Sequence, residues 1–160
     1  MGESIDPESA DASPPDLHSL VDQARRRFWL HARAGLLAEI TDFDLGTTFA
    51  ALAQRHRHTD IRILIDDDLV LKEQMPALVT SIKRLTTAVS VRRLRPAEES
   101  PEMVIAIADH TSWLKLTRVG SKRVLRGAID DRGGATRLAQ DFEANWMLSE
   151  EASELRRVLV

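Results

Sequence analysis

Apolar positions recur at two spacings along the chain, and the spacing indicates which segments are strands and which are helices. Continuous or alternating apolar runs of about four to eight residues are typical of strands, whereas apolar residues three and four positions apart are typical of amphipathic helices. The predicted strands are Arg27–Ala32, Asp60–Asp66, Val89–Leu94, Met103–Ala108, Thr111–Thr117 and Lys122–Arg126. The predicted helices are Asp16–Ala24, Thr47–Arg57, Leu69–Leu85 and Ala135–Leu148. The segment Gly35–Asp44 fits either a strand extension or a helical turn.

The order of these elements predicts the fold class. Strands that alternate with helices imply crossover connections, so we expect an α/β fold with a mixed, mainly parallel sheet and helices on both faces. A hairpin that turns near Asp109–His110 adds antiparallel strands. Ile61–Ile65 and Met103–Ala108 are almost continuously apolar, which indicates strands buried on both sides. Pro76 should open or kink its helix, and Gly133-Gly134 should break the chain before the last helix.

Composition and charge narrow the class of protein. A chain of 160 residues predicts a single domain, residues 16–160, behind a disordered acidic leader, residues 1–15. The first 24 residues hold six acids and no lysine or arginine, which leaves a small basic excess in the remainder. The absence of cysteine excludes disulfides and thiolate sites. Since neither a signal peptide nor a membrane-length apolar run is visible, we expect a cytoplasmic protein without a membrane partner.

Three consecutive aspartates are the first candidate site. Asp66, Asp67 and Asp68 follow a predicted strand at its carboxyl end, the edge at which α/β folds hold their ligands. Adjacent carboxylates suit a hard cation such as Mg²⁺. The alternative is that one of them caps the helix beginning near Leu69 and the others favour its positive end. Capping is the favoured interpretation, and we expect neither a bound metal nor a cofactor.

Histidine and arginine residues supply weaker evidence for a functional site. His56 and His58 form an H-x-H pair, but it falls at a predicted helix end and lacks a clear third metal ligand. Basic residues that could together form a phosphate-binding surface are Arg25–Arg27, Arg92, Arg93, Arg95, Arg118, Lys122, Arg123 and Arg126. A solvated face is the default interpretation, because an aromatic content of 4% offers few stacking partners for nucleic-acid bases.

Several phrases of the sequence occur in an order that points to a known superfamily. Phe49–His56 leads directly into the strand Ile61–Asp66, a proline-bearing loop precedes Glu102–Asp109, and Asp141-Phe-Glu-Ala-Asn-Trp146 closes the unit. Together they resemble half of a phospholipase-D-like domain over about residues 25–148. The chain is similar to uncharacterised bacterial domains of this type that lack the HKD motif. Half-size members of the superfamily form dimers that complete a site across a two-fold axis, so the resemblance implies a homodimer.

The chain departs from that superfamily where the chemistry would reside. Active members carry H-x-K-x-x-x-x-D, and in this register Asp109 fills the aspartate position while Glu102 and Val104 replace the histidine and the lysine. The implied phosphohistidine chemistry needs both missing side chains. His110 and Lys115 have four residues between them rather than one, so they do not restore the motif. We therefore expect no catalytic residue of this kind.

These observations lead to three functional hypotheses. The first is a non-catalytic phospholipase-D-like binding or assembly module, dimeric, with a phosphate-bearing ligand or a protein partner; its candidate ligand-binding residues are Asp66, Asp67, Asp109 and His110. The second is a divergent metal-dependent enzyme of phosphoester or nucleotide chemistry that uses Asp66–Asp68. The third is a nucleic-acid-associated regulatory domain that uses the arginines. The sequence favours the first and leaves the others open.

Overall fold

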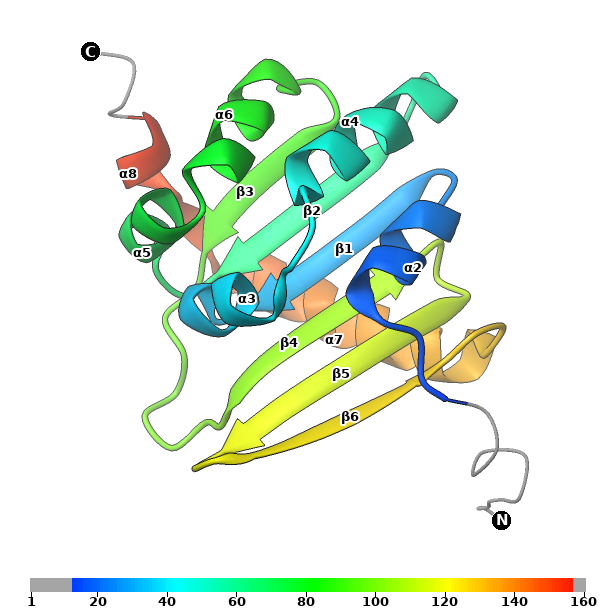
Figure 1. Ribbon diagram of the computed structural model, residues 1–160, viewed down its shortest axis with the longest axis vertical. Coiled ribbons are helices and arrows are strands. Elements are labelled where there is room, and N and C mark those ends of the chain that lie inside the picture. The colour runs from blue at the N-terminus through cyan, green and yellow to red at the C-terminus, as the bar shows by residue number, and fades with distance from the viewer. Residues whose placement is uncertain (1–12, 157–160) are drawn as a thin grey trace.

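The computed structural model describes residues 13–156, and these residues fold around a seven-stranded mixed sheet with the order β6-β5-β4-β1-β2-β3-β7 (Figure 1). The strands are β1 (Arg27–Ala32), β2 (Asp60–Ile65), β3 (Val89–Arg93), β4 (Glu102–Ala108), β5 (Ser112–Val119), β6 (Lys122–Ala128) and β7 (Glu150–Glu151). All six predicted strands are present. The α/β class predicted from their order is therefore confirmed.

Parallel pairing is confined to one part of the sheet. Strands β1, β2 and β3 are parallel neighbours, while the pairs β1–β4, β4–β5, β5–β6 and β3–β7 are antiparallel. The expectation of a mainly parallel sheet was therefore wrong. Only the first three strands are joined by helical crossovers, and the short turns after β4 and β5 force antiparallel pairs.

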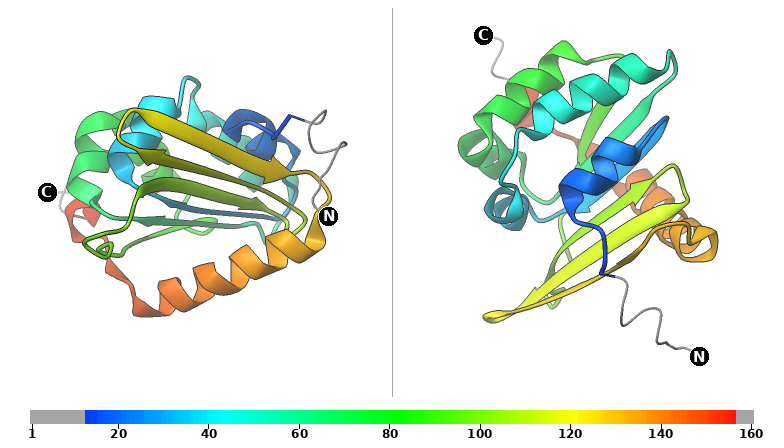
Figure 2. Two further views of the ribbon diagram at one scale, coloured as in Figure 1. Left: turned by 90° about the horizontal axis from the view of Figure 1, so that it is seen from below. Right: turned by 45° about the vertical axis from the view of Figure 1, so that its right-hand side comes forward.

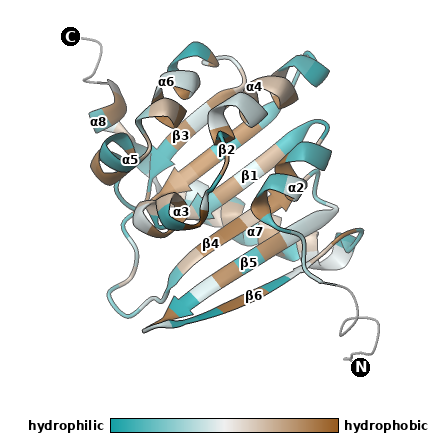
Figure 3. Ribbon diagram, viewed as in Figure 1, coloured by the Kyte–Doolittle hydropathy of each residue, from teal (hydrophilic) through white to brown (hydrophobic). Residues whose placement is uncertain are grey.

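Most helices cover one face of the sheet. They are α2 (Leu17–Gln23), α3 (Ala34–Ile40), α4 (Leu45–Arg55), α5 (Asp68–Gln74) and α6 (Pro76–Arg84), with the short α8 (Ser153–Arg156) beside α5. Their apolar sides share the main core with alternate residues of the strands, among them Phe28, Leu30 and Ile63. In Figure 3 the hydrophobic colour follows β2 and β4, the strands beneath this layer.

A single helix, α7 (Arg132–Leu148), covers the opposite face (Figure 2). Trp29, Leu64 and Ile107 from the sheet pack with Ala139 and Phe142 of this helix in a second, smaller core. The prediction of helices on both faces is thus confirmed, but most of the helices lie on one face. Within the described residues no helix has the length and apolar character needed to cross a membrane.

Three local expectations are corrected or decided by the structure. Leu69–Leu85 is two helices, because Pro76 begins a new helix. The ambiguous segment after β1 forms the helix α3. Gly133 and Gly134 do not break the chain but lie in the first turn of α7, where a Cβ on Gly134 would meet an Asp131 carboxylate oxygen at 2.3 Å. Most of the predicted leader, residues 1–12, lies outside the described residues.

Candidate functional site

The four residues predicted to bind a ligand do not meet. Asp66 and Asp67 follow β2 at the carboxyl edge of the parallel strands, whereas Asp109 and His110 form the turn between β4 and β5. Ala108, just before that turn, pairs with Phe28 near the start of β1. The two pairs therefore lie at opposite ends of the strands and do not form one site.

The turn after β4 is shaped by Asp109. Asp109 and His110 both have positive φ angles, 55° and 56°, and the N–H of Thr111 donates to the carbonyl of Ala108 at 3.0 Å. This is the pattern of a type I′ hairpin turn, in which aspartate is a favoured residue. The prediction that Asp109 serves as a turn residue is confirmed.

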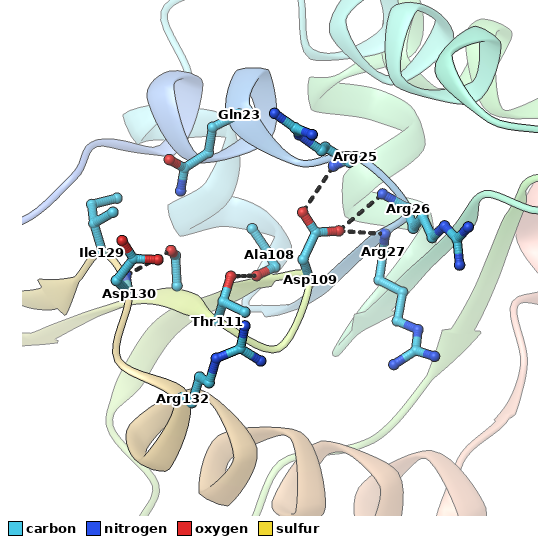
Figure 4. Close-up of a pocket in the computed structure, with 11 residues that line it drawn as sticks. Gln23, Arg25, Arg26, Arg27, Ala108, Asp109, Thr111, Ile129, Asp130 and Arg132 are labelled. Carbon is cyan, nitrogen blue, oxygen red and sulfur yellow. Dashed lines mark hydrogen bonds between the residues drawn. The ribbon is translucent and has the colours of Figure 1, made fainter.

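Asp109 also holds a second segment in place. Its carboxylate accepts hydrogen bonds from the backbone N–H groups of Arg25 at 2.9 Å, Arg26 at 2.9 Å and Arg27 at 3.0 Å. A carboxylate that receives three amide hydrogen bonds is a strong local anchor. The link between α2 and β1 is thereby fixed so that three consecutive arginines stand beside the β4–β5 turn (Figure 4).

A pocket of about 690 Å³ opens at this place. Its charged lining consists of Arg25, Arg26, Arg27, Arg132, Asp109 and Asp130, and Gln23, Thr111, Ser112 and Ile129 complete it together with Ala108. We call it the arginine pocket. Arginines outnumber acids in it by four to two, and the charge of Asp109 already faces three N–H donors. The pocket is therefore suited to an anion.

Arg132 reaches the arginine pocket from the first turn of α7 (Figure 4). The preceding residue, Asp131, caps that helix by accepting from the N–H of Gly134 at 3.1 Å, and its other oxygen accepts from the indole N–H of Trp113 at 2.9 Å. The hydrogen bond from the Trp113 indole, and to a smaller extent the one from the Gly134 backbone, lowers the pKa of the Asp131 carboxyl group. The sequence did not point to Arg132 as a pocket residue. The signal that could have found it is Asp131, because an aspartate before a helix is a recognisable N-cap and places Arg132 in the first turn.

His110 follows Asp109 in the turn and lines a small hollow beside the arginine pocket, together with Arg27, which lines both. Its ring packs edge-on against Trp29 with centroids 4.6 Å apart, and its Nδ1 lies 3.3 Å from a guanidinium nitrogen of Arg27. Nε2 is buried and has no hydrogen-bond partner within the described residues. Burial, followed by the charge of Arg27, lowers the pKa of His110, which favours the neutral ring at pH 7.

The three aspartates after β2 each cap a different helix. Asp66 accepts from the N–H of Ala34 in α3 at 2.8 Å, and Asp67 accepts from the N–H groups of Leu69 and Val70 in α5. Asp68 is fully buried and accepts from the N–H of Glu154 in α8 at 2.7 Å. Capping of the helix near Leu69 is therefore confirmed. Asp66 and Asp68 serve other helices than the one predicted.

The histidine and acidic side chains of the described residues do not gather into a metal site. Within residues 13–156, no three histidine, aspartate or glutamate side chains stand close enough to hold a metal ion. His56 ends α4, and its Nδ1 accepts from the backbone N–H of His58 at 3.2 Å. The predicted position of this histidine pair at a helix end is confirmed.

Glu102 and Val104, the positions that the resemblance sets against the histidine and lysine of the HKD motif, take part in packing and ion pairing. Val104 is fully buried in the main core. Glu102 accepts from Arg118 at 2.7 Å, and Arg118 also donates to Glu39 of α3 at 2.6 Å. Arg123 of β6 contacts the same Glu39 carboxylate. In the register that the resemblance implies, the histidine position therefore holds an ion-paired glutamate and the lysine position holds a core valine.

The remaining arginines do not extend the arginine pocket. Arg92 donates to the hydroxyl and carbonyl oxygens of Ser149, both at 2.7 Å, and Arg93 pairs with Glu150. Like Arg118 and Arg123, these two side chains tie elements of the fold together. Of the ten basic residues considered in the sequence, Arg25–Arg27 line the arginine pocket, four tie elements of the fold together, and Arg95, Lys122 and Arg126 do neither within the described part of the chain.

Comparisons with known proteins add a family assignment. A comparison with curated proteins found no match. The profile of a family described as a domain of unknown function, DUF7931, matches residues 9–158, which include the whole sheet and both layers of helices. The chain therefore belongs to the DUF7931 family.

Proposed function

We propose that this domain is a non-catalytic binding module that holds a phosphate-bearing ligand in the arginine pocket. The observation that carries the proposal is the anchoring of Arg25, Arg26 and Arg27 by the Asp109 carboxylate at the rim of the pocket. These bonds fix the backbone from which the three arginine side chains extend. Guanidinium groups bind phosphate oxygens through charge-assisted hydrogen bonds.

The composition of the pocket supports this choice of ligand. Among the described residues, the side chains of Arg25, Arg26 and Arg132 have no hydrogen-bonded or ion-paired partner, so their donors remain open to a ligand. Thr111 and Ser112 add hydroxyl groups. A volume of about 690 Å³ lies within the range of small-molecule sites, roughly 300–1,000 Å³.

We further propose that the fold derives from a phospholipase-D-like half domain that has lost its catalysis. The element order and the Phe142–Trp146 pair, whose stacked rings lie 5.6 Å apart in α7, support the relationship. The core position of Val104 and the ion pair of Glu102 support the loss of activity, because a valine cannot hold the phosphate charge and a glutamate paired with Arg118 replaces the histidine nucleophile.

Calorimetric titration with inorganic pyrophosphate tests the binding function. We expect saturable binding by the full chain, and a loss of roughly tenfold in affinity for each of Arg25→Ala, Arg26→Ala and Arg132→Ala, because each removes a charge-assisted hydrogen bond. Arg84→Ala is the matched control, since Arg84 is an exposed arginine at the end of α6, outside the pocket. Binding that these variants leave unchanged would overturn the proposal.

Turnover of a generic phosphodiester tests the absence of catalysis. With bis(4-nitrophenyl) phosphate we expect the full chain to release no more nitrophenol than the Arg132→Ala variant or buffer. Hydrolysis above that level that disappears in Asp109→Ala, in a variant shown by circular dichroism to be folded, would contradict the non-catalytic assignment. The same assay with Mg²⁺ or Mn²⁺ and with Asp67→Ala addresses the metal-dependent alternative.

A further inference from the structure

A second hollow lies at the opposite edge of the sheet from the arginine pocket. The loop from β3 to β4 crosses the carboxyl ends of β2 and β1, so that β4 lies on the other side of β1 and a crevice forms outside the carboxyl end of β1. Crevices at such a point are the usual ligand sites of α/β sheets. Here the crevice has a volume of about 350 Å³ and includes Arg33 after β1, Arg95 after β3 and Met103 of β4.

The crevice continues beneath α7. A neighbouring hollow of about 300 Å³ shares His31, Met103 and Asn145 with it. Strand pairing explains the continuity, because His31 of β1 stands opposite Ile105 of β4, and Ile105 opposite Lys115 of β5. The two hollows thus adjoin between the sheet and α7, and His31 lines both of them. We call the two together the His31 channel.

The two ends of the His31 channel differ in character. At the mouth, the guanidinium group of Arg95 makes no hydrogen bond or ion pair within the described residues, and Arg33 uses one nitrogen to donate to the carbonyl of Ser100 at 3.1 Å. The inner part is lined by the apolar side chains of Ile105, Leu138 and Phe142, and Lys115 and Asp141 also belong to its lining. The mouth also contains one acid, Asp66, whose carboxylate already accepts from the N–H of Ala34. A mouth with an excess of arginine therefore leads into a mainly apolar interior.

His31 lies between the mouth and the inner part of the His31 channel, where an uncharged side chain is needed. Burial, against a smaller opposing effect of the Asp66 charge, lowers its pKa to about 4, so the ring is neutral at pH 7. It makes no hydrogen bond to another described residue and lies edge-on to Phe142, with ring centroids 6.5 Å apart. A neutral imidazole permits an apolar chain to pass without desolvating a charge.

We propose that the His31 channel binds a medium-chain organic carboxylate, with the carboxylate at Arg33 and Arg95 and the alkyl chain against Ile105, Leu138 and Phe142. Leu148, which is 76% exposed at the mouth, would be covered by the first carbons of the chain. This site is distinct from the arginine pocket and does not depend on the function proposed for it.

Octanoate is the probe that tests the proposal. In ¹H–¹⁵N spectra of the full chain we expect saturable shifts at Arg33, Arg95, Ser100 and Asn145. Affinity should rise roughly three- to fourfold for each additional buried CH₂ from butanoate to octanoate. Arg95→Gln should weaken octanoate binding at least fivefold, whereas the matched Arg84→Gln should not. Leu138→Gln should remove the dependence on chain length.

Other outcomes overturn the proposal. Octanoate that fails to bind at millimolar concentration, or that binds equally well to Arg95→Gln, leaves no anion site at the channel mouth. Acetate that binds as tightly as octanoate contradicts the apolar interior. Pyrophosphate that displaces octanoate competitively from Arg33 and Arg95 would assign both ligands to one place. Loss of pyrophosphate binding in Arg132→Ala with octanoate binding intact separates failure of one proposal from failure of the other.

Discussion

At the scale of single residues, Asp109 joins two segments that are distant in the sequence. It has a positive φ angle in the β4–β5 turn and accepts hydrogen bonds from the backbone of the segment that precedes β1. The turn needs the φ angle, whereas the arginine pocket needs the carboxylate. Substitution by glycine separates the two roles, because glycine adopts positive φ without cost but offers no acceptor.

We expect Asp109→Gly to lower the free energy of unfolding by about 2 kcal/mol, because three N–H groups lose a charged acceptor. Asp130→Gly is the matched control, since Asp130 also has a positive φ angle, 58°, and glycine there should be neutral or slightly stabilising. Urea denaturation of both variants is the measurement. Equal stabilities of the two variants would show that the carboxylate does not hold the arginine segment.

A second residue-scale prediction concerns His31. Its pKa is about 4 in the folded protein against 6.5 for an ordinary histidine, so between these values the unfolded chain binds a proton that the folded chain does not. Stability from this residue is present above pH 6.5 and is lost as the pH falls toward 4. Between pH 7 and pH 4 the wild type should lose about 3 kcal/mol more than His31→Gln. Parallel stability profiles would contradict the burial of a neutral ring.

At the scale of elements, the start of α7 connects the helix to the sheet. Asp131 caps the helix through Gly134 and accepts from the indole N–H of Trp113 in β5. Asp131→Ala should lower the free energy of unfolding by about 2 kcal/mol, since it removes a cap and leaves the indole donor without its partner. Asp141→Ala, an exposed change within the same helix, should have little effect. Thermal unfolding of both variants would measure the difference.

Because Arg132 directly follows this cap, the Asp131 change should also affect the arginine pocket. We expect Asp131→Ala to weaken pyrophosphate binding several-fold through a less ordered Arg132, while Asp141→Ala leaves it unchanged. Isothermal titration of folded protein at a temperature well below the unfolding transition separates this effect from lost stability. Unaltered binding by Asp131→Ala would show that the cap does not position Arg132.

At the scale of the whole molecule, homodimer formation stays a prediction, and β6 is the element that offers an interface. It is an edge strand whose Val124 and Leu125 are 46% and 41% exposed. If two copies paired antiparallel about Leu125, Arg126 would face Val124 and Arg123 would face Gly127, so no like charges would stand directly opposite. The basic residues of β6 should nevertheless repel at longer range, and salt should strengthen the dimer.

Light scattering after size-exclusion chromatography measures the predicted dimer. We expect a dimer for the full chain and a monomer for Leu125→Asp, which places two carboxylates at the two-fold axis. Leu69→Asp is the matched control, because Leu69 is 42% exposed on α5 and should leave the dimer intact. A monomeric full chain at high salt would remove this interface from consideration.

The strands and most helices were predictable because their signals are local. Apolar periodicity placed β1 and β2 to within one residue at each end, and Pro76 marked a helix start. Gly133-Gly134 misled the prediction, because a local pattern does not show that the Asp131 carboxylate and the Trp113 indole occupy the space a Cβ on Gly134 would need. The antiparallel majority of strand pairs was likewise missed, since pairing depends on partners distant in the sequence.

The sequence by itself determined the α/β class, the turn at Asp109 and the absence of the histidine and lysine of the HKD motif, because each depends on neighbouring residues alone. Only the tertiary structure decided that Asp66 and Asp109 stand at opposite edges, that three adjacent aspartates cap three helices, and that Arg132 meets Arg25–Arg27. The first of these relationships arises because strands β1 and β4, about 75 residues apart in the chain, pair antiparallel. Strand pairing brings together side chains that no sequence pattern relates.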